Sequence, residues 1–290
     1  MYEAPVSARH PDGTRGAVRS MLQWKEKRDH VFTACDDGTV KMWSTQDGST
    51  WTQVTSAGFH EWRHVGAMQE VDGALYVGYG MPYAHSPDVT VDAIRVMDLK
   101  GGSAEEVVNP AFAFAHSHRI NCVAVVYVAG GDARVYTGDD EGRIAAWARP
   151  TPGAPFAQLA VLEGHARAIT ALIYISTNGM LWSASLDATV RIWNVTSNAC
   201  EHIITKDNGG HTGGVVALAV GQSAAEGTPK DYMISASMDG TMGVFQVLDG
   251  AMTYKHKCGI GVTSLAVFDP TPGTSALLLV GYQVRAFVCV

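Results

Sequence analysis

The chain has 290 residues, of which 47% are apolar and 17% charged, a composition that is typical of a compact globular protein and excludes an intrinsically disordered one. Its 28 acidic and 21 basic residues leave a net charge of −7, which disfavours a protein whose main task is to bind nucleic-acid phosphates. The apolar runs are too short to cross a bilayer, the amino terminus has no apolar signal segment, and the five cysteines contain no CxxC pair, so we expect reduced thiols and a cytoplasmic or nuclear location.

A short alternating apolar segment recurs six times along the chain. Alternation of period two indicates a half-buried strand. The predicted strands cover residues 18–22, 65–69, 120–126, 169–173, 215–220 and 262–268.

Each of these strands is followed by a hairpin, in which small residues lead to an acidic or glycine turn and then to a second alternating strand. Turns of the Asp-Gly-Thr type close hairpins, and the third strand of most copies ends on an aromatic residue. The predicted hairpins lie at residues 32–43, 75–98, 135–147, 181–193, 233–245 and 278–288. Repetition every 50 residues or so, with several strands per unit and no helical pattern, predicts an all-β radial array of small sheets.

Two of these units carry a family resemblance. The segment LEGHARAITAL (162–172), followed by SASLDATVRIWN (183–194), resembles a full WD40 repeat, and GGHTGGVVAL (209–218) with SASMDGTMGVF (235–245) resembles a second. The resemblance implies a single WD40 β-propeller domain over residues 1–290, built of four-stranded antiparallel blades. Six blades are recognisable, and seven with one missing or degraded is the alternative. We expect residues 1–10 to provide a strand that closes the ring by pairing with the last blade.

The resemblance also implies a buried hydrogen-bonding tetrad in each good repeat. Its members in the first are His165, Ser183, Asp187 and Trp193. In the next repeat His211, Ser235 and Asp239 match, but Phe245 cannot donate the last hydrogen bond. A catalytic triad is the alternative interpretation of these residue types. Because the set occurs in two units, we expect it to be structural.

No motif for chemistry appears in the chain: there is no phosphate-binding loop, HExxH, GxSxG or clustered metal-ligand spacing. We therefore expect no catalytic residues, no cofactor and no metal. The prediction is a non-enzymatic protein-interaction scaffold, a propeller subunit of a larger intracellular complex. Its expected partners are other proteins or peptides, with no membrane and no small-molecule substrate.

One face of such a propeller can be identified from the direction of its strands. The loop before the first strand of a blade and the turn between its second and third strands emerge on the same face. Leu186 and Met238 lie on this face and are apolar where polar residues are expected, which favours an interaction surface. Packing of these side chains on a neighbouring loop is the alternative. The predicted partner-binding residues, two of them in an inserted segment at 80–92, are Arg19, Asp36, Tyr83, His85, Arg119, Asp140, Leu186 and Met238.

A finer resemblance concerns the order of the units. The segment YVGYGMP (76–82) in a degraded second unit, and VLEGHARAITAL (161–172) at the head of the fourth, are similar to the WD40 part of CCCH zinc-finger/WD40 proteins. This likeness implies the alternative function, an RNA-associated module of a ribonucleoprotein or mRNA-regulatory complex. The CCCH finger itself is absent from these 290 residues, so we expect any nucleic-acid contact to be indirect.

Overall fold

The computed structural model describes residues 18–24, 27, 29–35, 39–45, 51–58, 64–71, 74–80, 94–98, 105–107, 118–127, 133–148, 156–223, 230–268 and 277–282. The chain divides into two compact units, Met1–Val125 with Ala148–Gln158, and Val126–Trp147 with Leu159–Val290. Within the described ranges, no helix has the length and apolar character needed to span a membrane.

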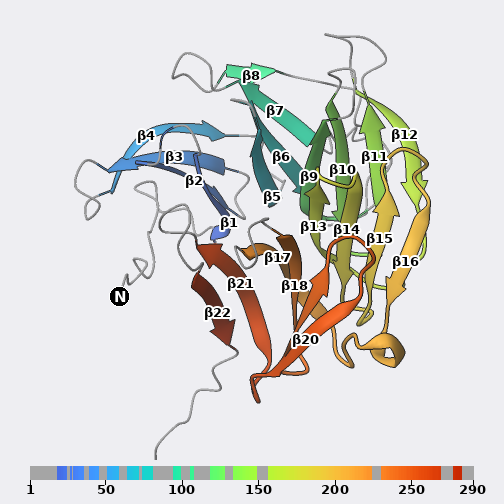
Figure 1. The fold of residues 1–290 in the computed structure, drawn as a ribbon. Coiled ribbons are helices and arrows are strands. Elements are labelled where there is room, and N and C mark those ends of the chain that lie inside the picture. The colour runs from blue at the N-terminus through green and yellow to red at the C-terminus, as the bar shows by residue number, and fades with distance from the viewer. Residues whose placement is uncertain are drawn as a thin grey trace, which may run out of the picture. The chain divides into compact units, whose positions relative to one another are not determined.

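The described strands form five four-stranded sheets and one two-stranded sheet (Figure 1). The first two sheets contain β1 (Val18–Gln23), β2 (His30–Cys35), β3 (Thr39–Thr45) and β4 (Trp51–Gly58), then β5 (His64–Val71), β6 (Ala74–Gly80), β7 (Ile94–Asp98) and β8 (Glu105–Val107). The third contains β9 (Ile120–Tyr127), β10 (Ala133–Asp139), β11 (Ile144–Ala148) and β12 (Ala157–Leu162).

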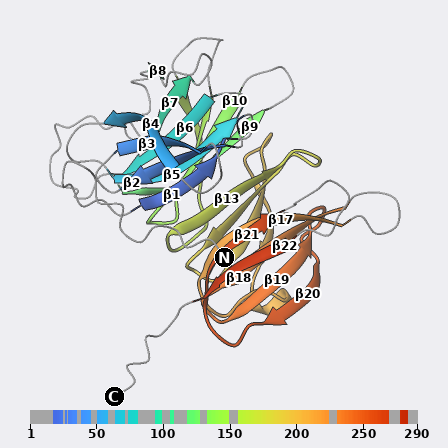
Figure 2. The same cartoon turned by 90° about the vertical axis from the view of Figure 1, so that its left-hand side faces the viewer.

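The remaining sheets follow the same order. The fourth contains β13 (Ile169–Ile175), β14 (Met180–Ser185), β15 (Val190–Asn194) and β16 (Cys200–Ile204), and the fifth β17 (Val215–Ser223), β18 (Lys230–Ser237), β19 (Thr241–Gln246) and β20 (Met252–Lys257). A one-turn 3-10 helix, η2 (Lys206–Asn208), lies between these two sheets in sequence. The described part of the sixth sheet is the hairpin of β21 (Val262–Phe268) and β22 (Leu277–Tyr282) (Figure 2).

These sheets confirm the predicted all-β fold of four-stranded antiparallel blades. Each of the six predicted first strands is present, and the pairing also repeats in detail. In five of the described sheets the pairing of the first strand with the second is interrupted by a register shift. The shift falls at the second or third residue of the first strand, between Val18/Ser20, Val65/Ala67, Ile169/Ala171, Val215/Ala217 and Val262/Ser264. Such a shared bulge is what repeated copies of one structural unit predict.

The first unit has its core between its first two sheets. Trp24 and Phe32 are buried there with Leu75 and Val77 of β6. Further along β6, Gly78 lies against β9: a Cβ at this position would be 2.9 Å from side-chain atoms of both Ile120 and Val123. The absence of a side chain at residue 78 therefore allows the two strands to approach closely.

The second unit has its main core between the sheets β13–β16 and β17–β20. Trp182 and Ile192 from the first sheet pack with Met233 and Phe245 from the second. The Trp182 and Phe245 rings are 6.4 Å apart. A smaller core joins Met242 of β19 to Val262 of β21. Burial of one sheet face against the next sheet is therefore the main stabilising contact of this unit.

The predicted ring-closing strand at residues 1–10 lies outside the described residues, as does most of the insertion at 80–92. Ring closure, the single-domain arrangement and the choice between six and seven blades stay predictions.

Candidate functional site

A buried hydrogen-bonded network ties the hairpin of β14 and β15 to the loop before β13. His165 Nδ1 donates to Asp187 Oδ2 at 2.8 Å, Ser183 donates to His165 Nε2 at 2.7 Å, and Trp193 Nε1 donates to Ser183 Oγ at 2.8 Å. The Asp187 carboxylate also accepts from Thr189 Oγ1 at 2.7 Å. The four predicted tetrad residues of this repeat are thus in mutual contact.

The next blade has a shorter version of this network. Ser235 donates to His211 Nε2 at 2.6 Å, while His211 Nδ1 donates to Thr241 Oγ1 at 2.8 Å and Thr241 donates to Asp239 Oδ1 at 2.6 Å. The Nδ1–Oδ1 separation between His211 and Asp239 is 3.7 Å, so threonine connects them. Phe245 is fully buried at the position of Trp193 and supplies no donor.

The electrostatics of both networks follow from burial and these bonds. Burial raises the pKa of Asp187, but hydrogen bonds from His165, Thr189 and the Ala166 amide outweigh it and hold the pKa below its ordinary value. For Asp239, the bonds from Thr241 and the Thr212 amide likewise outweigh burial and lower the pKa. These carboxylates therefore stabilise the fold above about pH 3.8, and the contribution is lost as pH falls through the lowered pKa values.

The buried hydroxyls do not form a nucleophile site. Ser183 and Ser235 have no exposed surface, and each is already bonded to its histidine. A serine nucleophile must reach a substrate carbonyl beside donors for the developing oxyanion. The networks can instead fix the position of the turns that follow β14 and β18. Among the residues that the structure describes, no group of three or more His, Cys, Asp or Glu could hold a metal ion.

We use the term turn face for the surface formed by the turns at residues 139–143, 186–189 and 238–241 and the loops at 165–168, 211–214 and 258–261. Backbone bonds join two of these turns to the loops: within their own sheets Leu186 N donates to Ala168 O at 2.9 Å and Met238 N donates to Gly214 O at 2.9 Å, and Cys258 N of the following loop donates to Gly240 O at 2.7 Å. These bonds and the buried networks hold the turns in place.

Three apolar side chains lie along the turn face. Met238 is 55% exposed and Ile260 is 56% exposed. Leu186 is half-buried, because its Cδ2 lies 3.0 Å from where a Cβ on Gly214 would stand. The two sequence-based interpretations thus apply to different residues: Leu186 packs partly on a neighbouring loop, whereas Met238 faces solvent.

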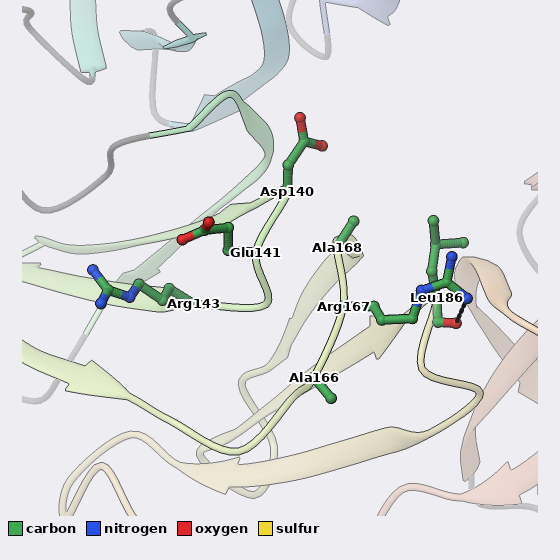
Figure 3. Close-up of a pocket in the computed structure, with 7 residues that line it drawn as sticks. All are labelled: Asp140, Glu141, Arg143, Ala166, Arg167, Ala168 and Leu186. Atoms are coloured by element: carbon green, nitrogen blue, oxygen red, sulfur yellow. Dashed lines mark hydrogen bonds between the residues drawn. The ribbon is translucent and has the colours of Figure 1, made fainter. Parts of the chain in front are cut away.

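An open pocket of about 550 Å³ lies beside Leu186, between the β10–β11 turn and the loop before β13 (Figure 3). Gly142, at φ +92°, lets the two segments meet, since a Cβ there would be 2.7 Å from His165 O and 2.8 Å from Arg167 O. The residues that line the pocket are Asp140, Glu141, Arg143, Ala166, Arg167, Ala168 and Leu186.

The predicted partner-binding residues are only partly brought together. Asp140 and Leu186 line this pocket, and Met238 lies one blade further on. Arg119 belongs to the first unit, where its Nε donates to Asn121 Oδ1 at 3.0 Å. Asp36, Tyr83, His85 and the Arg19 side chain lie outside the described residues.

Sequence reasoning missed Arg143, Arg167 and Ile260. A signal for Ile260 was available, because an isoleucine between two glycines in the loop before β21 is apolar where a polar residue is expected. The two arginines have no such local signal, since only the contact between the β10–β11 turn and the loop before β13 places them at one pocket.

Comparison with known proteins gives matches to one repeat family. The family profile described as WD domain, G-beta repeat, matches residues 7–44 and 156–194. Zinc finger CCCH domain-containing protein 17 of Oryza sativa subsp. japonica is 26% identical over 181 residues, which cover 62% of this chain and 35% of that protein. Pre-mRNA-processing factor 19 of Mus musculus is 31% identical over 81 residues, covering 28% and 14%, respectively.

A further relative is ribosome biogenesis protein ytm1 of Botryotinia fuckeliana, 29% identical over 118 residues that cover 39% of this chain and 23% of that protein. Each match thus covers well under half of the relative's own length. The family matches include β1, β2 and most of β3 of the first sheet, and β12 together with β13, β14 and β15, which carry the complete His-Ser-Trp-Asp network with the loop before them. The chain thus contains two segments that match the WD domain, G-beta repeat family, within a series of recurring four-stranded antiparallel sheets.

Proposed function

We propose that this chain is a non-enzymatic protein-interaction scaffold, a WD40 propeller subunit of a larger intracellular complex that binds other proteins or peptides through its turn face. The observation that carries the proposal is the exposure of Met238 and Ile260 on the turn face, with Leu186 half-buried one blade before them. Exposed apolar side chains that neighbour one another mark interaction sites, and such anchors supply most of the affinity of an interface.

The rigidity of the turn face supports this proposal. Ser185 Oγ donates to Arg167 O at 2.8 Å, and Ser237 Oγ donates to Gly213 O at 2.8 Å. Both hydroxyls are buried and act at the same position of consecutive repeats. A surface that is ordered before binding loses little conformational entropy when the partner arrives.

The test is a double substitution, Met238→Asp with Ile260→Asp. It places charges where the partner's apolar groups would lie and leaves the buried networks intact. Leu248→Asp is the matched control, because Leu248 is exposed in the β19–β20 turn, at the other end of strand β19. We expect the folded double variant to lose co-purification of the main partner, measured by quantitative mass spectrometry, and the control to retain it. Recovery of every partner by the double variant would place the binding surface elsewhere.

The remaining predicted contacts belong to the same proposal. Asp140 and Arg119 would orient the partner, and Arg19, Asp36, Tyr83 and His85 would extend the contact. Charged groups at the edge of an interface mainly tune the association rate. Alanine substitution at the charged positions among them should therefore change the rate of association and its salt dependence more than it changes the lifetime of the complex.

The second candidate function is an RNA-associated module of a ribonucleoprotein or mRNA-regulatory complex, located in the nucleus or cytoplasm. The names of three relatives, a CCCH zinc-finger protein, a pre-mRNA-processing factor and a ribosome biogenesis protein, favour it. Because the chain has a net charge of −7, we propose that the contact with RNA is indirect, through protein partners. Fluorescence anisotropy with labelled single-stranded RNA tests this. Tight binding by the isolated chain that falls steeply between 50 and 200 mM salt would indicate direct RNA recognition instead.

A further inference from the structure

The β10–β11 turn differs from the corresponding turns of the next two sheets. Its own bonds are made by the buried Asp139, whose Oδ1 accepts from the amides of Glu141 at 3.0 Å and Arg143 at 2.9 Å. In the next sheet the equivalents of Glu141 and Arg143 are Asp187 and Thr189, which belong to the buried network. Because Asp139 accepts the hydrogen bonds that stabilise this turn, the side chains of Glu141 and Arg143 are not needed for them, and both are exposed.

Two arginines line the pocket from different segments. Arg143 extends from the β10–β11 turn, and Arg167 from the loop before β13 (Figure 3). The Arg167 Nη1 donates to Leu186 O at 3.3 Å. Across the described part of the chain, the Arg143 guanidinium has no hydrogen bond or ion pair, and that of Arg167 has no carboxylate partner. Both side chains are exposed, so their charges are available to a ligand.

The pocket also contains two acidic residues. Asp140 and Glu141 each already take part in interactions within the chain. They lie on the β10–β11 turn, whereas Arg167 and the apolar side chain of Leu186 form the opposite wall (Figure 3). An incoming acidic group would therefore find its partners at the two arginines, and an apolar group would find Leu186 beside Arg167.

Resting on the proposed scaffold function, we propose that the partner segment is an acidic-apolar peptide, with carboxylate side chains on Arg143 and Arg167 and apolar side chains that continue over Leu186 and Met238. Arginine forms paired hydrogen bonds with carboxylates, which makes it a selective contact for acidic groups. Because the two arginines stand on different walls, the segment carries acidic residues at two separate points. The anchors at Leu186 and Met238 supply affinity, and the arginines supply selectivity.

A random peptide library displayed on phage, selected on the full chain, tests this proposal. We expect the enriched peptides to combine Asp or Glu with Leu, Ile, Met or Phe. One such synthetic peptide, measured by fluorescence anisotropy, should bind Arg167→Glu and Arg143→Glu each about five- to tenfold more weakly. Gln246→Glu with Leu248→Glu is the control, since it lowers the net charge by the same two units at exposed positions near the β19–β20 turn and should leave the affinity unchanged.

Charge reversal gives the sharper result. Selection on Arg167→Glu should replace one acidic position of the peptides by Lys or Arg, a change that altered folding would not produce. Enrichment of basic or uncharged peptides on the wild-type chain overturns the inference. If such peptides still lose binding on Met238→Asp, the turn face binds partners and only the acidic specificity is wrong. If no selected peptide depends on Met238, Ile260 or the pocket arginines, the proposed function fails as well.

Discussion

Substitution of Asp187 by alanine removes the acceptor at the centre of the complete buried network. The carboxylate accepts from His165 Nδ1 at 2.8 Å, from the Ala166 amide at 3.0 Å, and from the Thr189 amide and hydroxyl at 2.9 and 2.7 Å. The His165 side chain is fully buried. After the substitution its Nδ1 retains only Thr189 Oγ1, at 3.1 Å.

The size of the loss in the free energy of unfolding depends on which donors lose their acceptor. The Ala166 amide is exposed and can bond to water, so its loss costs little. The buried imidazole N–H is different, because a buried donor without a good acceptor costs about 1–3 kcal/mol. We expect Asp187→Ala to lower the free energy of unfolding by about 1–3 kcal/mol. In a chain of this size each kcal/mol corresponds to a fall in Tm of about 2–4 °C.

The assay is urea and thermal unfolding followed by circular dichroism, with peptide and partner binding measured on the folded variant. Glu163→Ala is the matched control, since Glu163 is exposed, lies two residues before His165 and makes no contact of this kind in the described structure. We expect the control to unfold like the wild type, and Asp187→Ala to keep partner binding while it is folded. A variant with wild-type stability would refute the structural role of the network, and a folded, stable variant without binding would show that Asp187 serves a partner directly.

Further predictions concern pH, backbone strain and ring closure. Burial, together with the Lys255 charge, lowers the pKa of His211 below 6.5 despite the nearby Asp239 carboxylate. Below about pH 6.5 the unfolded chain therefore takes up a proton at this residue that the folded chain does not, and the free energy of unfolding falls. Comparison of urea midpoints at pH 7.5 and 5.5 should show a smaller loss for His211→Gln, and an equal loss contradicts the assignment. Ala188 stands at φ +71° where the neighbouring turns have glycine, so Ala188→Gly should be neutral or stabilise by up to about 1 kcal/mol. Gly142→Ala, whose Cβ would clash with two carbonyls, should destabilise by about 1–3 kcal/mol; the opposite order in thermal unfolding would refute the turn geometry. Deletion of residues 2–9 should expose sheet edges and cause aggregation detectable by light scattering, whereas an equally stable monomer would exclude closure by this segment.

The sequence by itself determined the inner strands, and the family resemblance supplied the histidine, serine, aspartate and tryptophan of the buried network. Alternating residues around an Asp-Gly type turn are a local signal, and burial of one face of these strands enforces the alternation. The outer strands β12, β16 and β20 were not located from the sequence, because most of their side chains are exposed on both faces and alternation therefore disappears. For the same reason the sequence showed a pattern of three strands six times, while the fourth strand of each sheet came from the family resemblance.

Only the tertiary structure decided what each turn residue does. Asp140, Leu186 and Met238 occupy the same position of consecutive repeats, yet Asp140 lines a pocket, Leu186 packs on Gly214 and Met238 faces solvent. Their surroundings are set by the neighbouring loop, which lies more than 20 residues away in sequence for Leu186 and Met238 alike. The pocket arginines depend on the same kind of contact, since the close approach of Gly142 to the carbonyls of His165 and Arg167 brings the β10–β11 turn and the loop before β13 together. A repeat pattern fixes the position of a residue in its own blade, whereas burial and available charge depend on the adjacent blade, which the local pattern does not encode.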